Sequence, residues 1–120
     1  MEGIDKSNFN NILRKIIKKS LFTERQIEII LNQKSLLESK FSISKGAYYR
    51  QVSQSREKLV SFYYTIVLLQ GLGVILPDDI DVISKVSEQI RVINESDIFP
   101  EREEDVISVI DRLVRQACSM

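Results

Sequence analysis

The chain has 120 residues, of which 43% are hydrophobic and 28% are charged, so it can bury a core and global disorder is excluded. It has no histidine and one cysteine, Cys118, which excludes an internal disulfide framework, a cysteine-based zinc site and the usual histidine general base. The net charge is zero, but residues 1–60 carry twelve basic and six acidic side chains, whereas residues 61–120 carry five and eleven.

The composition predicts helices. Only four glycines and two prolines interrupt the chain, and we expect one all-α domain over residues 1–120, a compact bundle of about five helices. Residues 1–20 lack a continuous apolar run, and the most apolar segment, 62–76, is shorter than the roughly 20 residues of a membrane helix. We therefore expect a cytoplasmic protein without a membrane segment.

Three helices are predicted in the first part of the chain. Apolar residues at three- and four-residue steps predict a helix over about 7–19. Thr23 and Gln26 match a capping box, which predicts a helix that ends near Asn32. A short helix is expected over roughly 34–40, with Leu36 and Leu37 facing inward.

Three further helices follow. Residues 42–44 are expected to form a turn with Ser44 as the N-cap of a helix over about 45–70, which is polar in its first half and apolar in its second. The pattern does not tell whether this helix is continuous or kinked. Helices beginning at Pro77 and Pro100, each followed by acidic residues, are expected to form an antiparallel hairpin.

The order of short helix, turn and longer helix predicts a helix-turn-helix, a motif that lays the start of its second helix in the DNA major groove. Arginine can bond to guanine and glutamine to adenine, while serine, lysine and tyrosine suit phosphates. The candidate nucleic-acid-binding residues are Ser44, Lys45, Gly46, Tyr48, Tyr49, Arg50, Gln51, Lys34 and Lys40. A packing role for Tyr48 and Tyr49, and a merely solvated face for Lys45, Arg50 and Gln51, are the alternatives.

Residues 22–59 resemble the helix-turn-helix of sigma-factor region 4 and related regulators. Phe22-Thr-Glu-Arg-Gln26 is similar to the family's Leu-Thr-Glu-Arg-Gln, and Ile43-Ser-Lys-Gly-Ala-Tyr-Tyr-Arg-Gln51 is similar to its turn and recognition helix. The resemblance implies a small helical transcription regulator that binds DNA. Because the spacer between Gln26 and Ile43 is shorter than in that family, either the first two helices merge or the turn differs.

Two functions remain open on the sequence. The first is a DNA-binding transcriptional regulator, with RNA as an alternative ligand, that forms a homodimer through the acidic half at positions such as Ile110 and Leu113. The second is a helical protein-interaction module, indicated by the apolar segment 62–76. Acidic residues after Pro77 and Pro100 suit helix starts, and no Gly-rich phosphate loop is present. We therefore expect no catalysis, no cofactor and no metal.

Overall fold

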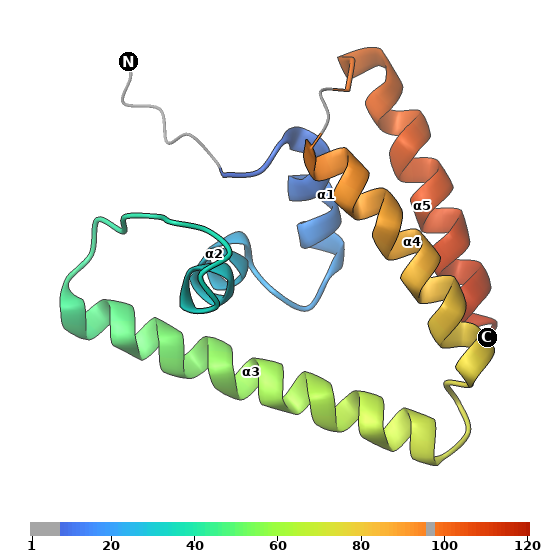
Figure 1. Ribbon diagram of the computed structural model, residues 1–120, viewed down its shortest axis with the longest axis horizontal. Coiled ribbons are helices and arrows are strands. Elements are labelled where there is room, and N and C mark those ends of the chain that lie inside the picture. Colours follow the sequence, from blue (N-terminus) through green and yellow to red (C-terminus); the bar gives the residue numbers. More distant parts are fainter. Residues whose placement is uncertain (1–7, 96–97) are drawn as a thin grey trace. The chain divides into compact units, whose positions relative to one another are not determined.

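The computed structural model describes residues 8–95 and 98–120, and every regular element within them is a helix (Figure 1). The expected all-α fold of about five helices is confirmed. The helices are α1 (Asn11–Lys19), α2 (Glu24–Gln33), α3 (Lys45–Gly71), α4 (Pro77–Glu95) and α5 (Glu103–Cys118), with the short 3-10 helix η1 (Pro100–Arg102) leading into α5. Among the described residues, no helix is long and apolar enough to span a membrane.

The helices belong to two compact units. Residues 1–19 and 75–120 form the hairpin unit, which contains α1, α4, η1 and α5. Residues 20–74 form the α3 unit, which contains α2 and α3. The α3 unit holds seven basic and four acidic residues, so it is the basic part of the chain.

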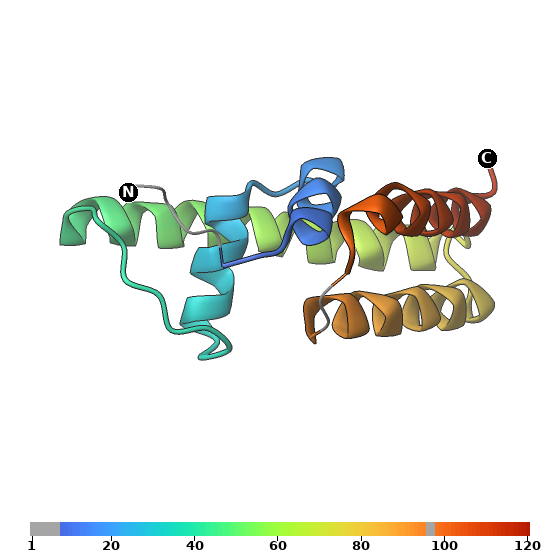
Figure 2. The same ribbon diagram turned by 90° about the horizontal axis from the view of Figure 1, so that it is seen from above.

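The hairpin unit is built on the predicted pair of helices, α4 and α5, which run side by side (Figures 1 and 2). Ile93 of α4 and Ile110 of α5 are buried against Ile12 and Leu13 of α1. The Asn10 side chain, just before α1, donates a hydrogen bond of 2.9 Å to the Ile93 carbonyl. The predicted C-terminal hairpin is confirmed, and α1 completes its core.

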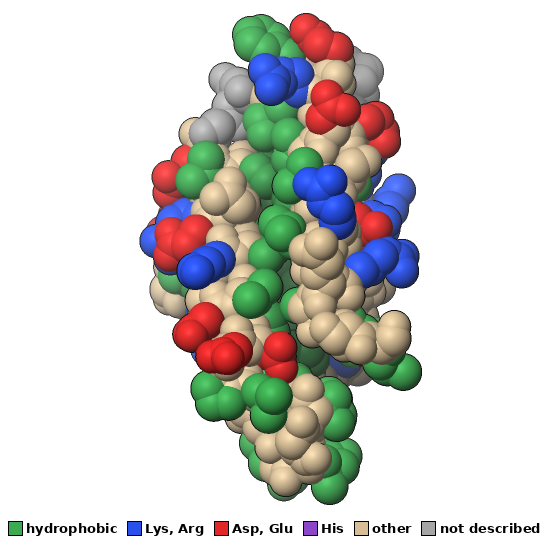
Figure 3. Space-filling view, turned by 90° about the vertical axis from the view of Figure 1, so that its right-hand side faces the viewer, with side chains coloured by type: hydrophobic (Ala, Val, Ile, Leu, Met, Phe, Trp, Pro, Cys, Tyr) green, Lys and Arg blue, Asp and Glu red, His purple; other side chains and the backbone are tan. Residues whose placement is uncertain are grey.

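Charged side chains join α1 to α5 at the edge of this core. The Lys15 Nζ lies 3.0 Å from Glu104 and 3.8 Å from Glu103, and the Lys19 Nζ lies 3.9 Å from Asp111. The hydrogen bond to the Glu104 carboxylate raises the pKa of Lys15 above its ordinary value. Figure 3 shows apolar side chains gathered along the seam of the hairpin, with acidic and basic side chains on both flanks.

In the α3 unit, α2 crosses the N-terminal half of α3 at a steep angle (Figures 1 and 2). Ile29 of α2 and Val52 and Ser55 of α3 are buried, and they line one small cavity between the two helices. Beside it, the Phe22 and Phe62 rings meet edge to face, with centroids 6.3 Å apart. The predicted capping box is present, since Gln26 N donates to Thr23 Oγ1 and Thr23 N to Gln26 Oε1. This cap fixes the start of α2.

The prediction of a short helix over residues 34–40 is wrong. The chain instead leaves α2 through a turn at Ser35. Ser35 adopts the left-handed conformation, with φ of 58°. Its N–H donates to the Asn32 carbonyl at 3.1 Å, and the Leu36 N–H donates to the Leu31 carbonyl at 2.8 Å. These two bonds form a Schellman motif, which turns the chain away from the helix axis. Residues 37–41 have no helical structure, and Leu36, which was expected to face inward, is 70% exposed.

Ser35→Gly is expected to raise the free energy of unfolding by about 0.5–1 kcal/mol. A serine in the left-handed conformation carries a steric penalty that glycine does not. Urea denaturation followed by circular dichroism measures the effect, with Ser53→Gly as the control, since Ser53 is exposed within α3 and glycine is unfavourable there. If Ser35→Gly destabilised the protein as much as Ser53→Gly does, the strain at this turn would be refuted.

Helix α3 is continuous from the Ser44 N-cap to Gly71, which answers the question that the sequence left open. It ends in a second Schellman motif: Gly73 has φ of 80°, its N–H donates to Gln70, and the Val74 N–H donates to Leu69 at 2.8 Å. Helix α2 packs only on the first half of α3 (Figure 1). Large apolar side chains on the second half are therefore left exposed.

Candidate nucleic-acid interface

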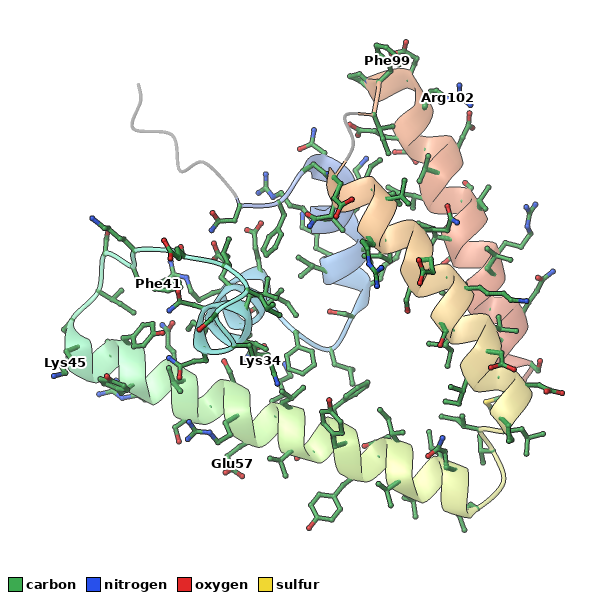
Figure 4. The ribbon with its side chains drawn as sticks, in the orientation of Figure 1. Lys34, Phe41, Lys45, Glu57, Phe99 and Arg102 are labelled. Carbon is green, nitrogen blue, oxygen red and sulfur yellow. The ribbon has the colours of Figure 1, made fainter. Side chains whose placement is uncertain are left out.

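The predicted recognition residues gather around the start of α3. Ser44 is the N-cap, and its Oγ accepts a hydrogen bond of 3.1 Å from the Ala47 N–H, so the first turn is held in a fixed position. No acidic residue lies in this first turn, so the positive end of the helix dipole is not neutralised by a side chain of the helix. Lys45 projects from this end (Figure 4).

Four exposed cations lie on α3 or on the connection that leads into it, although Lys34 lies beside the middle of α3, where it lines a cavity with Arg56 and Leu59. Two lie on the connection between α2 and α3, and two lie on α3 itself: Lys34, Lys40, Lys45 and Arg50. Within the described part of the chain, none of them forms an ion pair with a carboxylate. Tyr49, on the same turn of α3, is 56% exposed. These side chains are thus free to meet an anionic surface.

Tyr48 has a different environment. Its hydroxyl accepts hydrogen bonds of 2.8 Å from the side-chain amides of Asn32 and Gln33 on α2, and its ring lies 5.3 Å from the Phe41 ring. The Arg25 guanidinium lies 5.3 Å from the centre of Phe41 on this cluster. These contacts match the packing alternative for Tyr48. They tie the connection and α2 to the first turns of α3, and no sequence motif marked Asn32, Gln33 or Phe41 as part of this support.

Gln51 and Gly46 also differ in what they can offer a base or a phosphate. Gln51 is half-buried, and its Oε1 is enclosed without a hydrogen-bond partner among the described residues. This oxygen is therefore not available to a base in the structure as it stands. Gly46 is exposed, and a Cβ added there would meet nothing within 4 Å. A ligand backbone can therefore approach α3 closely at this position.

The motif that presents these residues differs from the expected helix-turn-helix. The first helix of the pair is α2, and residues 34–44 connect it to α3 without a helix. The predicted turn over residues 42–44 is present, with bends at residues 42–43 and the cap at Ser44. The short spacer left two alternatives, merged helices or a different turn, and the structure has a different turn. Any docking geometry must follow α2 and α3 rather than a short helix over 34–40.

The basic residues of α1 lie in the hairpin unit, where Lys15 and Lys19 pair with acidic residues of α5. The described residues hold no group of three histidine, cysteine, aspartate or glutamate side chains that could bind a metal ion. Comparison with family models, curated proteins and solved structures finds no match to this chain. The site must therefore be interpreted from its own chemistry.

Proposed function

We propose that this protein is a cytoplasmic DNA-binding transcriptional regulator, and that the start of α3 enters the major groove. The observation that carries the proposal is the set of exposed cations in the first turns of α3 and on the connection that leads into it, Lys40, Lys45 and Arg50, none of which is held in an ion pair by a described acidic residue. Cations that are not neutralised by the protein can displace the counterions condensed on phosphates, which supplies most of the non-specific affinity for DNA.

The residues divide into two roles. Lys34, Lys40 and Lys45 suit phosphate contacts, which orient a protein on the duplex without reading its sequence. Arg50, on the second turn of α3, suits a bidentate contact with guanine in the major groove. Tyr48, with Asn32 and Gln33, acts as the support that holds this turn in place. The proposal includes a homodimer, because two-fold copies of such a helix read two half-sites.

Fluorescence anisotropy with a labelled mixed-sequence duplex tests the proposal. Binding should weaken by about 100-fold or more between 50 and 200 mM salt, the dependence expected for several phosphate contacts. A hairpin RNA of the same length serves as the competitor. Displacement by RNA at lower concentration than by DNA would assign the basic face to RNA, and no binding to either at 50 mM salt would refute the proposal.

A helical protein-interaction module remains the second candidate. The observation in its favour is the exposed apolar side of the second half of α3, where Tyr63, Tyr64 and Val67 are 60%, 74% and 66% exposed. A stretch of large apolar side chains of this kind marks an interaction surface. The two functions are compatible, since Lys45 and Arg50 lie in the first half of α3 and the exposed apolar side lies in its second half.

A further inference from the structure

The second half of α3 carries an apolar groove of about 380 Å³ on one side of the helix. Its lining comes from α3 alone: Arg56, Leu59, Val60, Tyr63, Tyr64 and Val67. These positions are three and four residues apart, so they form one stripe along the helix. The stripe continues into Leu68, which is 58% exposed.

The stripe is symmetric about the midpoint between Tyr63 and Tyr64. Three pairs of positions at equal distances from this midpoint hold the same residue type. They are tyrosine at 63 and 64, valine at 60 and 67, and leucine at 59 and 68. At about 100° per residue, all six positions lie within about 90° of the centre of one face. The residues between them are not symmetric: Ser61 mirrors Ile66, and Phe62 mirrors Thr65. The symmetry thus belongs to this stripe and not to the helix as a whole, and within the stripe Leu59 is half-buried beside α2 while the other five side chains are exposed.

We propose that a second copy of this chain covers the stripe, with the two α3 helices antiparallel around a two-fold axis at that midpoint. A two-fold interface brings one surface patch against itself, so a residue on one copy meets its mirror position on the other. Val60 then lies opposite Val67 of the partner, Leu59 opposite Leu68, and Tyr63 opposite Tyr64. Like side chains of matching size therefore meet at these six positions.

Charge supports the same arrangement. Helix α3 has no basic residue in its last turn, so the negative end of its dipole has no cation from its own helix. Arg56 lines the groove, and its mirror position is Gly71, the last residue of α3. In the antiparallel pair, each Arg56 guanidinium therefore lies beside the carbonyl end of the partner helix. A parallel pair would instead place the two Arg56 side chains together.

The exposed area suits a weak dimer. Two well-exposed tyrosines with the flanking valines and leucines present roughly 500 Å² per copy, or about 1,000 Å² in total, which is below the roughly 1,200 Å² at which stable interfaces begin. This inference rests on the proposed function only for the use of the dimer on DNA. Because its test contains no nucleic acid, a failure here would leave the DNA-binding proposal standing, and a failure of DNA binding would leave the dimer standing.

Sedimentation velocity of the full chain over a range of concentrations gives the first test. The wild type should sediment as a dimer of the 13.9 kDa chain. Val67→Glu places a carboxylate at the interface twice per dimer and should raise the dimer dissociation constant by about 100-fold or more. Thr65→Glu is the control, because Thr65 is exposed on the opposite side of α3 and the variant adds the same charge. It should leave the dissociation constant unchanged.

Two results of that test would overturn the proposal. One is a wild type that remains monomeric at every concentration, which would mean that no second copy covers the stripe. The other is an equal loss of dimer in both variants, which would move the interface elsewhere. Circular dichroism of each variant checks that the helices remain folded, and Val60→Glu provides a second variant at the mirror position if Val67→Glu does not fold.

Disulfide cross-linking tests the antiparallel orientation. In a Cys118→Ser background, chains with Val60→Cys are mixed with chains carrying Val67→Cys under mild oxidation. The antiparallel pair predicts a cross-linked heterodimer in the mixture and little cross-linking in either chain alone. A parallel pair would give the reverse, with Val60→Cys chains linking to each other, and would refute the proposed arrangement.

Discussion

Changing Lys45 and Arg50 together to alanine is expected to weaken DNA binding by about 10- to 100-fold at moderate salt, because one phosphate contact and one base contact are removed. The slope of log affinity against log salt should fall by about 1, since one phosphate is no longer neutralised. The melting temperature should stay within a few degrees of the wild type, because both side chains are exposed and neither forms an ion pair with a described residue.

The matched control is the Lys85→Ala, Arg112→Ala variant, which removes the same charge from exposed positions of the hairpin unit. It should retain nearly wild-type affinity. Equal losses in the two double variants would show that net charge alone governs binding. A large drop in melting temperature for the α3 variant would assign Lys45 or Arg50 to packing instead.

Gly46→Ala is expected to change fold stability and DNA affinity in opposite directions. The added methyl group has open space around it and favours the helix, so the protein should become more stable by a few tenths of a kcal/mol. If the phosphate backbone approaches α3 here, the same methyl group should lower DNA affinity. Higher stability with unchanged affinity would place the DNA elsewhere on the α3 unit.

Ile29→Ala is expected to lower the free energy of unfolding by about 2–5 kcal/mol, the usual range for removing a fully buried isoleucine side chain beyond Cβ. Ile29 is 1% exposed, is the buried residue of α2, and lines a cavity with Val52 and Ser55 of α3. Hydrogen exchange should show the loss most strongly in α2 and in the first half of α3, where the helices touch. The support around Tyr48 should weaken with it, so DNA affinity should also fall.

Ile12→Ala provides the comparison, because Ile12 is 2% exposed in the core of the hairpin unit. This variant should lower the free energy of unfolding by a similar amount, but it should increase amide hydrogen exchange chiefly in α1, α4 and α5. If both variants increased exchange equally along all helices, the chain would unfold as a single cooperative unit, and the regional prediction would be wrong.

The sequence predicted best those features that depend on neighbouring residues. The capping box at Thr23, the cap at Ser44 and the helix start at Pro77 all follow from bonds or dihedral preferences within a few residues. The hairpin followed from two strong periodic stripes. The prediction that failed, the end of α2, is also local. It depends on Ser35 in a left-handed conformation that glycine or asparagine usually marks, and neither residue is present there to indicate it.

Contacts between distant residues could not be predicted from the pattern. Ile110 was a candidate for the dimer interface, but it is buried in the core of the hairpin unit, because α1 packs on the same stripe of α5. The hydroxyl of Tyr48 is held by two amides of α2, a contact that depends on how α2 crosses α3. Periodicity identifies an apolar face but does not tell which element covers it.

If the protein binds DNA as the proposed dimer, the uninterrupted course of α3 from Lys45 to Gly71 determines the length of the operator. With a rise of 1.5 Å per residue, an antiparallel pair centred between Tyr63 and Tyr64 separates the two Arg50 Cα atoms by about 40 Å along the helices. This is slightly more than the 34–36 Å of one DNA turn, or about 12 base pairs between half-site centres. In such a dimer, the number of α3 residues between Arg50 and the two-fold axis determines the spacing of the two half-sites.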